Sequence, residues 1–262
     1  MTDWLTLCRD AVSGVQRVLD ERPERGDREP VVGAGEGGDE TTLIDAAAEA
    51  AVLARFNGLE GVTIVSEEAG ILGSGKIHVV VDPIDGSLNA KRGIPFFSLS
   101  IAVASGPTMG DVDFGFVHDF GTGEEWTAVR GEGARLNGAA LDGDMPKESI
   151  EILSFEATRT DLVAERAAAF VGLAYRLRIM GSLAISLCHL AAGRVDAVCS
   201  LKPARSVDIA AAQLLVRERG LAIDLPESPP FAEAPLDLEG RSRVVAAGTH
   251  EGCNRLAAAL SA

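Results

Sequence analysis

The stretch Val-Val-Val-Asp-Pro-Ile-Asp-Gly-Ser, residues 79–87, decides how the rest of the chain is arranged. The run 77–81, which leads into it, has the apolar, β-branched composition of a strand buried on both faces. Proline cannot donate a hydrogen bond to a sheet ladder, so Pro83 predicts that this strand ends at Asp82. We therefore expect a buried strand whose last residue is an acid.

The turn after this strand carries a second acid. The chain turns through Asp85 and Gly86, and Ser87 is placed to begin a short helix. The carboxylates of Asp82 and Asp85, with the carbonyl of Ile84, form an all-oxygen set that suits a hard cation such as Mg²⁺. The amides of Gly86 and Ser87 offer a phosphate site at the helix N-terminus. Asp-Pro and Asp-Gly pairs are also common in ordinary turns, so this stretch alone leaves both interpretations open.

Length and composition describe an ordinary globular chain. Its 262 residues, 47% hydrophobic and 24% charged, suffice for a sizeable core. No run of 18 apolar residues occurs and the N-terminal residues lack a basic and then apolar segment, so we predict neither a membrane span nor a signal peptide. The four cysteines have no Cys-x-x-Cys spacing, and we interpret them as buried free thiols of a cytoplasmic protein: Cys8, Cys188, Cys199 and Cys253.

The net charge of −15 argues against nucleic acid as a partner. It also disfavours an anionic substrate, unless metal ions or local arginines reverse the field in the site.

The first part of the chain predicts helices followed by an antiparallel sheet. Helical spacing of apolar residues favours helices over 2–21 and 42–56, with a flexible, glycine-rich loop at 33–38 between them. A strand over 62–65 follows. Turn signals separate the later strands, which we expect at 96–104, 112–118, 125–130 and 134–136.

The remainder alternates strands and helices, which indicates α/β layering. We expect strands at 150–155, 175–179, 197–200, 221–224 and 243–247, and helices at 161–171, 182–192, 207–219 and 251–260. The change of pattern predicts two parts: an N-terminal α+β half that binds metal, 1–148, and a C-terminal α/β half that completes the active site, 149–262.

Three further acids fall where an element begins or ends. Glu67 follows the strand 62–65, Asp45 lies in the first turn of a helix, and Asp208 stands at a helix start. Adjacent residues at a strand end point to opposite faces, so only one of Glu67 and Glu68 can face a given cleft. Each position also has a plain structural explanation, as a capping acid or part of a solvated loop.

Four blocks of sequence, taken in order, resemble the inositol monophosphatase family of Mg²⁺-dependent, lithium-sensitive phosphatases. They are Asp39-Glu40-Thr41-Thr42-Leu43-Ile44-Asp45, Ser66-Glu67-Glu68, Asp82 to Asn89 with Pro95-Phe96-Phe97 after it, and Val207-Asp208-Ile209-Ala210-Ala211. Gly181-Ser182 before a helix also matches. The resemblance spans nearly the whole chain, and the glycine-rich loop with segment 89–95 looks most like the archaeal-type members, which act on fructose 1,6-bisphosphate as well as inositol phosphates.

The resemblance implies a layered α-β-α-β-α sandwich of the sugar phosphatase type, usually a homodimer, that hydrolyses phosphate esters with Mg²⁺ or Mn²⁺. Glu67, Asp82 and the carbonyl of Ile84 would hold one ion. A second ion would be held by Asp82, Asp85 and Asp208.

The remaining implied roles concern water and substrate. A third, weaker ion would use Glu67, with Asp39 as a candidate ligand. Ser87, where the family usually has threonine, would pair with Asp45 to orient and deprotonate the attacking water, and Glu67 completes the implied catalytic set. The residues expected to contact substrate lie in the turn, at the helix start after residue 181 and in the nearby basic segments: Asp85, Gly86, Ser87, Ser182, Leu183, Arg178, Lys202 and Arg205.

Departures from the family bear on the substrate. Ala34, Val207 and Leu201 stand where its inositol phosphatases have lysine, tryptophan and an inositol-binding glutamate. Lys202 and Arg205 supply positive charge nearby, and we predict that Arg205 grips the phosphate of a bisphosphate that is not being cleaved. The expected substrates are therefore fructose 1,6-bisphosphate, inositol 1-phosphate or both.

Two other functions stay open. The chain could be a phosphatase of 3′-phosphoadenosine nucleotides, although their Gly-Ser-Ser-Leu-Lys-type segment reads Gly-Ser-Leu-Ala-Ile at 181–185. It could also be a non-catalytic regulatory protein that keeps the fold, such as a partner of the transcription machinery.

Overall fold

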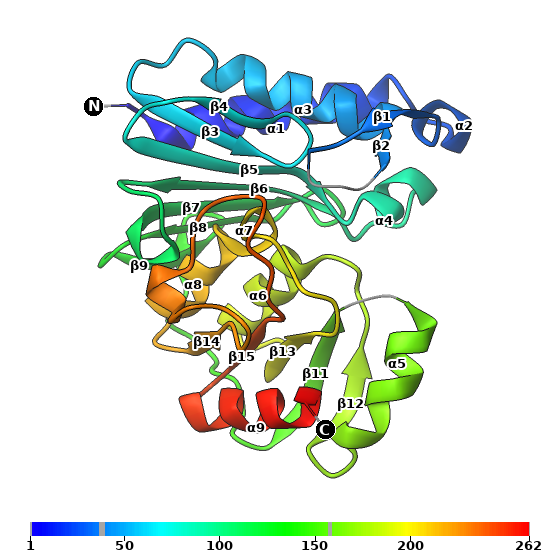
Figure 1. The fold of residues 1–262 in the computed structure, drawn as a ribbon, viewed down its shortest axis with the longest axis vertical. Coiled ribbons are helices and arrows are strands. Elements are labelled where there is room, and N and C mark those ends of the chain that lie inside the picture. Colours follow the sequence, from blue (N-terminus) through cyan, green and yellow to red (C-terminus); the bar gives the residue numbers. More distant parts are fainter. Residues whose placement is uncertain (1, 37–39, 157–158, 262) are drawn as a thin grey trace.

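A computed structural model describes residues 2–36, 40–156 and 159–261. Figure 1 shows five stacked layers: helices α1 (Trp4–Asp20) and α3 (Leu43–Phe56), a large sheet, a middle layer of helices, a smaller sheet, and an outer layer with α5 (Thr160–Arg166) and α9 (His250–Ser261). The predicted α-β-α-β-α sandwich is confirmed.

The large sheet has eight strands within the described residues, in the order β10-β9-β8-β7-β6-β5-β3-β4. Its neighbours pair antiparallel except for β3 and β5, which are parallel. The bounds are β3 (Val62–Ser66), β4 (Gly70–Gly73), β5 (Ile77–Asp85), β6 (Ser98–Ala104), β7 (Val112–Asp119), β8 (Glu125–Val129), β9 (Gly133–Leu136) and β10 (Ala139–Ala140). The sequence did not predict β4 or β10.

Strand β5 does not end where proline predicts. It continues through Pro83 to Asp85, and its register with β6 shifts between Asp82 and Asp85. On the other side, its pairing with β3 stops at Val81. The missing N–H of Pro83 therefore falls where the ladder is already irregular on one edge and absent on the other, so the strand loses little by including it.

The start of the glycine-rich segment, residues 33–34, lies in a strand rather than a loop. Gly33 and Ala34 belong to β1 (Val31–Ala34), which pairs antiparallel with β2 (Glu40–Thr42). Residues 37–39 lie outside the described residues. The prediction of a loop over 33–38 is wrong at its start, because cross-strand pairing outweighs the low strand propensity of glycine.

The middle layer packs between the two sheets. It contains α6 (Leu183–Ala191), α7 (Ser206–Ile209) and α8 (Ala212–Glu218), and their apolar side chains share one core with both sheets. The helix predicted over 207–219 is thus interrupted. At the interruption the backbone of Ala211 approaches β7 so closely that a Cβ on Gly115 would lie 2.5 Å from the Ala211 oxygen.

The smaller sheet has the order β12-β11-β13-β15-β14. Strands β11 (Ile150–Glu156), β12 (Ala174–Arg178) and β13 (Ala197–Ser200) run parallel, while β14 (Ala222–Asp224) and β15 (Val245–Ala247) are antiparallel to their neighbours. The short helix α2 (Arg25–Arg28) and 3-10 turns at Met109–Asp111, Ala167–Phe170 and Phe231–Glu233 complete the fold. The division at residue 148 follows the change of sheet, and we keep it as a proposal, because one core joins the two parts.

Two simpler predictions can be compared directly. All four cysteines are free and buried. Among the described helices, none combines the length and the apolar character that a membrane span requires.

Candidate active site

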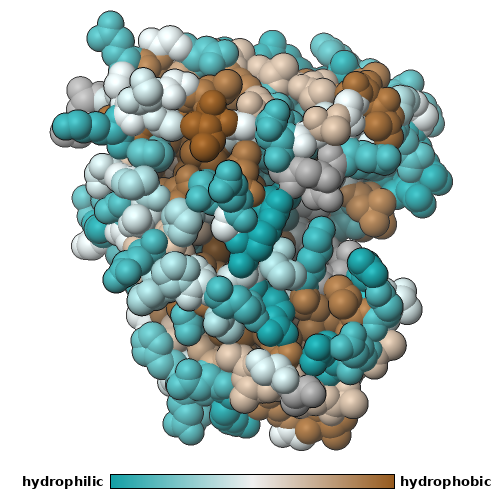
Figure 2. All heavy atoms as spheres, viewed as in Figure 1, coloured by the Kyte–Doolittle hydropathy of each residue, from teal (hydrophilic) through white to brown (hydrophobic). Residues whose placement is uncertain are grey.

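Most of the residues predicted for the site lie around a cleft of about 650 Å³ between the sheets. Figure 2 shows the molecule notched on one side at this level. Most of the predicted site residues line the cleft: Glu67, Asp82, Ile84, Asp85, Gly86, Ser87, Leu183, Lys202, Arg205 and Asp208. It is also lined by Glu156, Gly181, Ser200, Pro203, Ala204 and Arg241.

Parallel pairing explains why Glu67 and Asp82 meet. Ser66 of β3 lies opposite Val81 of β5, so the next residue of each chain segment is an acid at the same edge of the sheet. Asp82 is only 2% exposed, and its Oδ1 accepts a hydrogen bond of 3.0 Å from the Ile84 amide. Glu68 faces away and accepts from Thr41, as the alternation predicts.

Asp85 is held by the start of helix α6. Its Oδ2 accepts hydrogen bonds from the Ser182 hydroxyl at 2.6 Å and the Ala184 amide at 2.7 Å. The positive end of the helix dipole favours a carboxylate there. Ser182, predicted as a substrate contact, is instead buried, does not line the cleft, and caps the helix by accepting from Ile185.

This contact gives a first prediction. Ser182→Ala removes both the helix cap and the bond that orients Asp85, so we expect the free energy of unfolding to fall by about 1 kcal/mol and kcat/KM to fall by about tenfold. Asp3→Ala is the matched control, because it removes the N-cap of α1, which lies in the layer of α1 and α3. The control should lose stability alone, measured by thermal melts beside phosphate-release kinetics. Equal activity in the two variants would contradict the positioning role.

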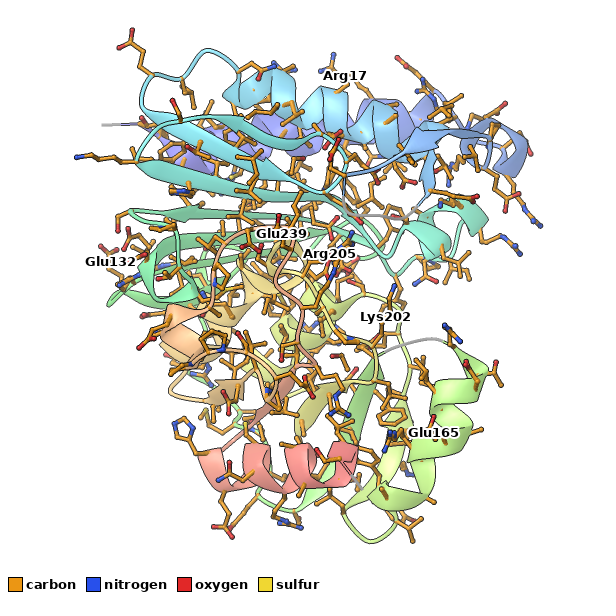
Figure 3. The ribbon with its side chains drawn as sticks, in the orientation of Figure 1. Arg17, Glu132, Glu165, Lys202, Arg205 and Glu239 are labelled. Atoms are coloured by element: carbon orange, nitrogen blue, oxygen red, sulfur yellow. The ribbon has the colours of Figure 1, made fainter. Side chains whose placement is uncertain are left out.

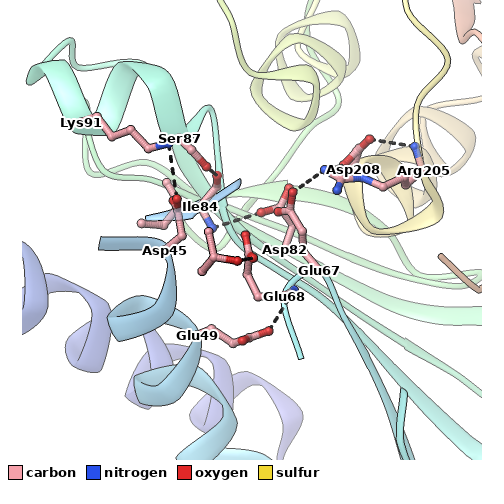
Figure 4. A network of polar contacts seen from close by, with 11 residues as sticks. Asp45, Glu49, Glu67, Glu68, Asp82, Ile84, Ser87, Lys91, Arg205 and Asp208 are labelled. Carbon is pink, nitrogen blue, oxygen red and sulfur yellow. Dashed lines mark hydrogen bonds and ion pairs between the residues drawn. The ribbon is translucent and has the colours of Figure 1, made fainter. Parts of the chain in front are cut away.

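Asp208 and Arg205 form the opposite wall (Figure 4). Asp208 closes the first turn of α7 by accepting from the Arg205 amide at 2.7 Å. The Arg205 guanidinium donates to Asp208 Oδ1 at 3.1 Å and also to Glu67. The predicted substrate contact thus lies folded onto two acids of the site, which the sequence did not anticipate because Glu67 is 138 residues away.

Burial, together with the nearby negative charges, shifts the pKa values of Glu67, Asp82 and Asp85 upward. Burial, with the charges of Asp208 and Glu68, raises the pKa of Glu67 to about 7 despite the opposing effect of Arg205. Burial also raises the pKa of Asp85 to about 7. The pKa of Asp82 lies well above its usual value, because it is buried beside three other acids. Cations that neutralise this charge would compete with protons for the same oxygens.

The chemistry of this donor set fits a hard cation, since it is buried, all-oxygen and strongly negative. Within the described residues, however, no three acidic, histidine or cysteine side chains converge closely enough to form a metal site as they stand. Arg205 already contacts two of the carboxylates. The assignment of metal ligands therefore stays a prediction.

Ser87 lines the cleft, whereas Asp45 is buried and is not among the described lining residues. Asp45 Oδ2 accepts from the amide and hydroxyl of Thr42 and lies 3.4 Å from the Lys91 ammonium, while Oδ1 is buried and has no hydrogen-bond partner among the described residues. The Ser87 hydroxyl donates to the Ile84 carbonyl at 2.9 Å. A direct Ser87–Asp45 bond is not part of the described structure.

Arg178 is another predicted site residue that does not line the cleft. Arg178 is exposed on the edge strand β12, donates to the carbonyl of Leu177, and is not among the described lining residues. The structure adds no contact that supports its predicted role with substrate, and that role stays a prediction. Asp39 lies outside the described residues.

Sequence reasoning missed two buried glutamates. Glu49 of α3 accepts from Ser66 and from the amides of Glu68 and Ala69, and so fixes the loop that carries Glu67. Glu156, at the end of β11, accepts from the Gly181 amide at 2.9 Å and lines the cleft. The signal for Glu156 was available, because it is an acid that directly follows the strand predicted over 150–155.

Comparison with known proteins agrees with this geometry. The model of the inositol monophosphatase family matches residues 5–262. A fructose-1,6-bisphosphatase/inositol-1-monophosphatase of Methanothermobacter thermautotrophicus is 34% identical over 262 residues, covering 95% of this chain and 93% of the relative. Nus factor SuhB of Pasteurella multocida is 37% identical over 192 residues, covering 70% of each chain.

Solved structures give the same result. The crystal structure of an inositol monophosphatase–fructose 1,6-bisphosphatase superimposes with a TM-score of 0.85 at 28% identity, covering 98% of this chain and all of that one. Fold and cleft together define a phosphoric monoester hydrolase that acts on sugar or inositol phosphates. The chain belongs to the inositol monophosphatase family.

Proposed function

We propose that this chain is a Mg²⁺-dependent phosphatase of fructose 1,6-bisphosphate, inositol 1-phosphate or both. The observation that carries the proposal is the convergence of Glu67, Asp82, Asp85 and Asp208 on one cleft that also contains basic side chains. The printed names of the archaeal relatives support the two substrates. Phosphate monoesters hydrolyse very slowly in water, so charge neutralisation and alignment of a water are the main tasks.

The acids divide into two ligand sets that share Asp82. Glu67, Asp82 and the Ile84 carbonyl would hold one Mg²⁺, and Asp82, Asp85 and Asp208 a second. A third and weaker ion would use Glu67, and Mn²⁺ could replace Mg²⁺. When bound, these ions would neutralise phosphate charge and lower the pKa of the attacking water.

The protein's own groups would orient the reactants. The amides of Gly86 and Ser87 would bind phosphate oxygens at the start of α4 (Ser87–Arg92). The Oδ1 of Asp45 is buried and has no hydrogen-bond partner within the part of the chain that the structure describes, so it is an acceptor suited to take the water's proton. Ser87 would hold the same water, so the two side chains would act together through it.

This shared role gives a second prediction. Groups that act as a unit are not additive when removed. We expect Ser87→Ala and the double variant Ser87→Ala/Asp45→Asn to lose similar activity, measured as kcat at saturating Mg²⁺. Losses that multiply, with unchanged metal affinity, would show that the two side chains act separately.

Charge in the cleft bears on the choice of substrate. Figure 3 shows Lys202 and Arg205 at the level between the two sheets. Arg205 is held by Glu67 and Asp208, whereas Lys202 is exposed, lines the cleft and forms no ion pair with the carboxylates of the described residues. We therefore propose that Lys202, rather than Arg205, binds the second phosphate of a bisphosphate substrate.

The third prediction follows. Lys202→Ala should raise the KM for fructose 1,6-bisphosphate by about tenfold, because one charge-assisted contact is worth ~1.5–3 kcal/mol. The KM for glycerol phosphate, which has no second phosphate, should change little. Steady-state phosphate release on both substrates measures this, and equal losses would remove the support for a bisphosphate.

The alternative functions differ in the substrates from which the protein would release phosphate. A phosphatase of 3′-phosphoadenosine nucleotides would prefer 3′-phosphoadenosine 5′-phosphate in a substrate panel, and a regulatory protein would release phosphate from no substrate. The similarity to Nus factor SuhB supports the regulatory function as a second candidate. We expect the panel to show the fastest release from fructose 1,6-bisphosphate or inositol 1-phosphate, and the reverse ranking would refute the proposal.

Assembly and location complete the proposal. We propose a cytoplasmic homodimer that has neither nucleic acid nor membrane as a main partner. The buried free cysteines favour the cytoplasm, and exposed apolar side chains at Val171, Tyr175 and Ile179 favour a contact along the β12 edge. Sedimentation equilibrium would measure the assembly.

A further inference from the structure

Arg205 occupies an unusual position for a cleft arginine. Its side chain is only 11% exposed and extends from the N-cap of α7 across to the end of β3. One terminal nitrogen contacts Glu67 and lies 3.1 Å from Asp208 Oδ1. Burial opposes the charged form, yet the charges of Asp208, Glu67 and Asp82 outweigh it, so the pKa of Arg205 is raised.

These contacts engage two carboxylates that are also among the proposed metal ligands. Glu67 Oε1 and Asp208 Oδ1 come from different ligand sets, and Arg205 bridges them. A guanidinium that donates to a carboxylate oxygen and a divalent cation that binds the same oxygen repel each other at that distance. The two therefore cannot both be bound there at full strength.

We propose that Arg205 is a built-in counter-ion that competes with divalent cations for Glu67 and Asp208, and so sets how much cation the site requires. The inference rests on the proposed metal-dependent function. Without a cation, Arg205 offsets the repulsion of the acids. When a cation binds, the guanidinium must give up at least one of these two contacts.

A competing role and a supporting role of Arg205 predict opposite changes in cation affinity when its side chain is removed. If Arg205 competes, its removal strengthens cation binding. If it only holds Glu67 and Asp208 in place for the cation, its removal weakens cation binding. A general loss of positive charge would also strengthen binding, so a control must remove another cation from the cleft. Lys202→Ala does this without touching either acid.

Mn²⁺ binding to metal-stripped, full-length protein, measured by isothermal titration calorimetry, tests the proposal. We expect Arg205→Ala to bind Mn²⁺ about tenfold more tightly than the wild type, with a much smaller change in Lys202→Ala. Arg205→Lys, which keeps the charge and loses the planar fork, should lie between. Equal or weaker binding by Arg205→Ala, or an equal gain in Lys202→Ala, would overturn the proposal.

Melting temperatures with and without Mg²⁺ give a second readout, which shows whether the Arg205→Ala protein is folded. In excess chelator, Arg205→Ala should melt below the wild type, and added Mg²⁺ should raise its melting temperature by more than it raises that of the wild type. An equal rise would overturn the inference even if the metal site exists. No Mn²⁺ binding by the wild type would instead refute the proposed function, and the inference with it.

Discussion

We expect Asp82→Asn to lower the rate of phosphate release by about three orders of magnitude or more and to leave the fold intact. Asp82 belongs to both proposed ligand sets, so the loss of its charge weakens both. The amide keeps the shape of the carboxylate, and its oxygen can still accept from the Ile84 amide. Since Asp82 is buried among other acids, removal of its charge also relieves repulsion.

Thermal melts beside the kinetics separate these effects. In excess chelator, Asp82→Asn should melt no lower than the wild type. Asp196→Asn is the contrast, because Asp196 is buried outside the cleft and accepts from the amides of Lys147, Glu151 and Ile152. It should lose stability and keep its kcat. An Asp82→Asn protein that retains a tenth of wild-type activity would contradict the ligand assignment.

Gly86→Ala should cause the next largest loss. Gly86 has φ 95°, where a side chain is strained, and a Cβ would lie 2.9 Å from the oxygens of both Gly181 and Phe96. These contacts would push the turn away from α6 and displace Asp85 and Ser87 together. We expect about a hundredfold loss in kcat/KM and a destabilisation of about 2–4 kcal/mol.

Gly93→Ala is the matched control for this change. Gly93 ends the same helix with φ 71°, and a Cβ there would meet nothing within 4 Å. It should cost only about 1–2 kcal/mol of strain and leave kcat/KM close to that of the wild type. Chemical denaturation and steady-state kinetics on both variants give the comparison. Equal activity losses would mean that backbone strain, rather than the close approach to Gly181, governs the site.

The sequence was sufficient where the physics is local. Turn chemistry at Asp85 and Gly86 predicted the start of α4. Alternation at a strand end predicted that only one of Glu67 and Glu68 faces the cleft, and the family resemblance pointed to Glu67. Apolar periodicity predicted α1 and α3 within two residues of their observed ends. Each of these depends on neighbours only a few positions apart.

The sequence failed where distant segments decide the outcome. Nothing near Pro83 reveals that the ladder around it is already broken, so the end of β5 was misplaced. The contact between Arg205 and Glu67 and the exposure of Arg178 depend on how strands and helices pack. The roles of Glu49 and Glu156 likewise appear only when loops from other elements reach them.

Phosphate release by wild-type protein with and without a divalent cation tests the central claim most directly. Metal-stripped protein in excess chelator should release no phosphate from fructose 1,6-bisphosphate or inositol 1-phosphate. Addition of Mg²⁺ beyond the chelator should restore release from at least one of them. Robust release in chelator, or none from either substrate at any Mg²⁺ concentration, would contradict the account.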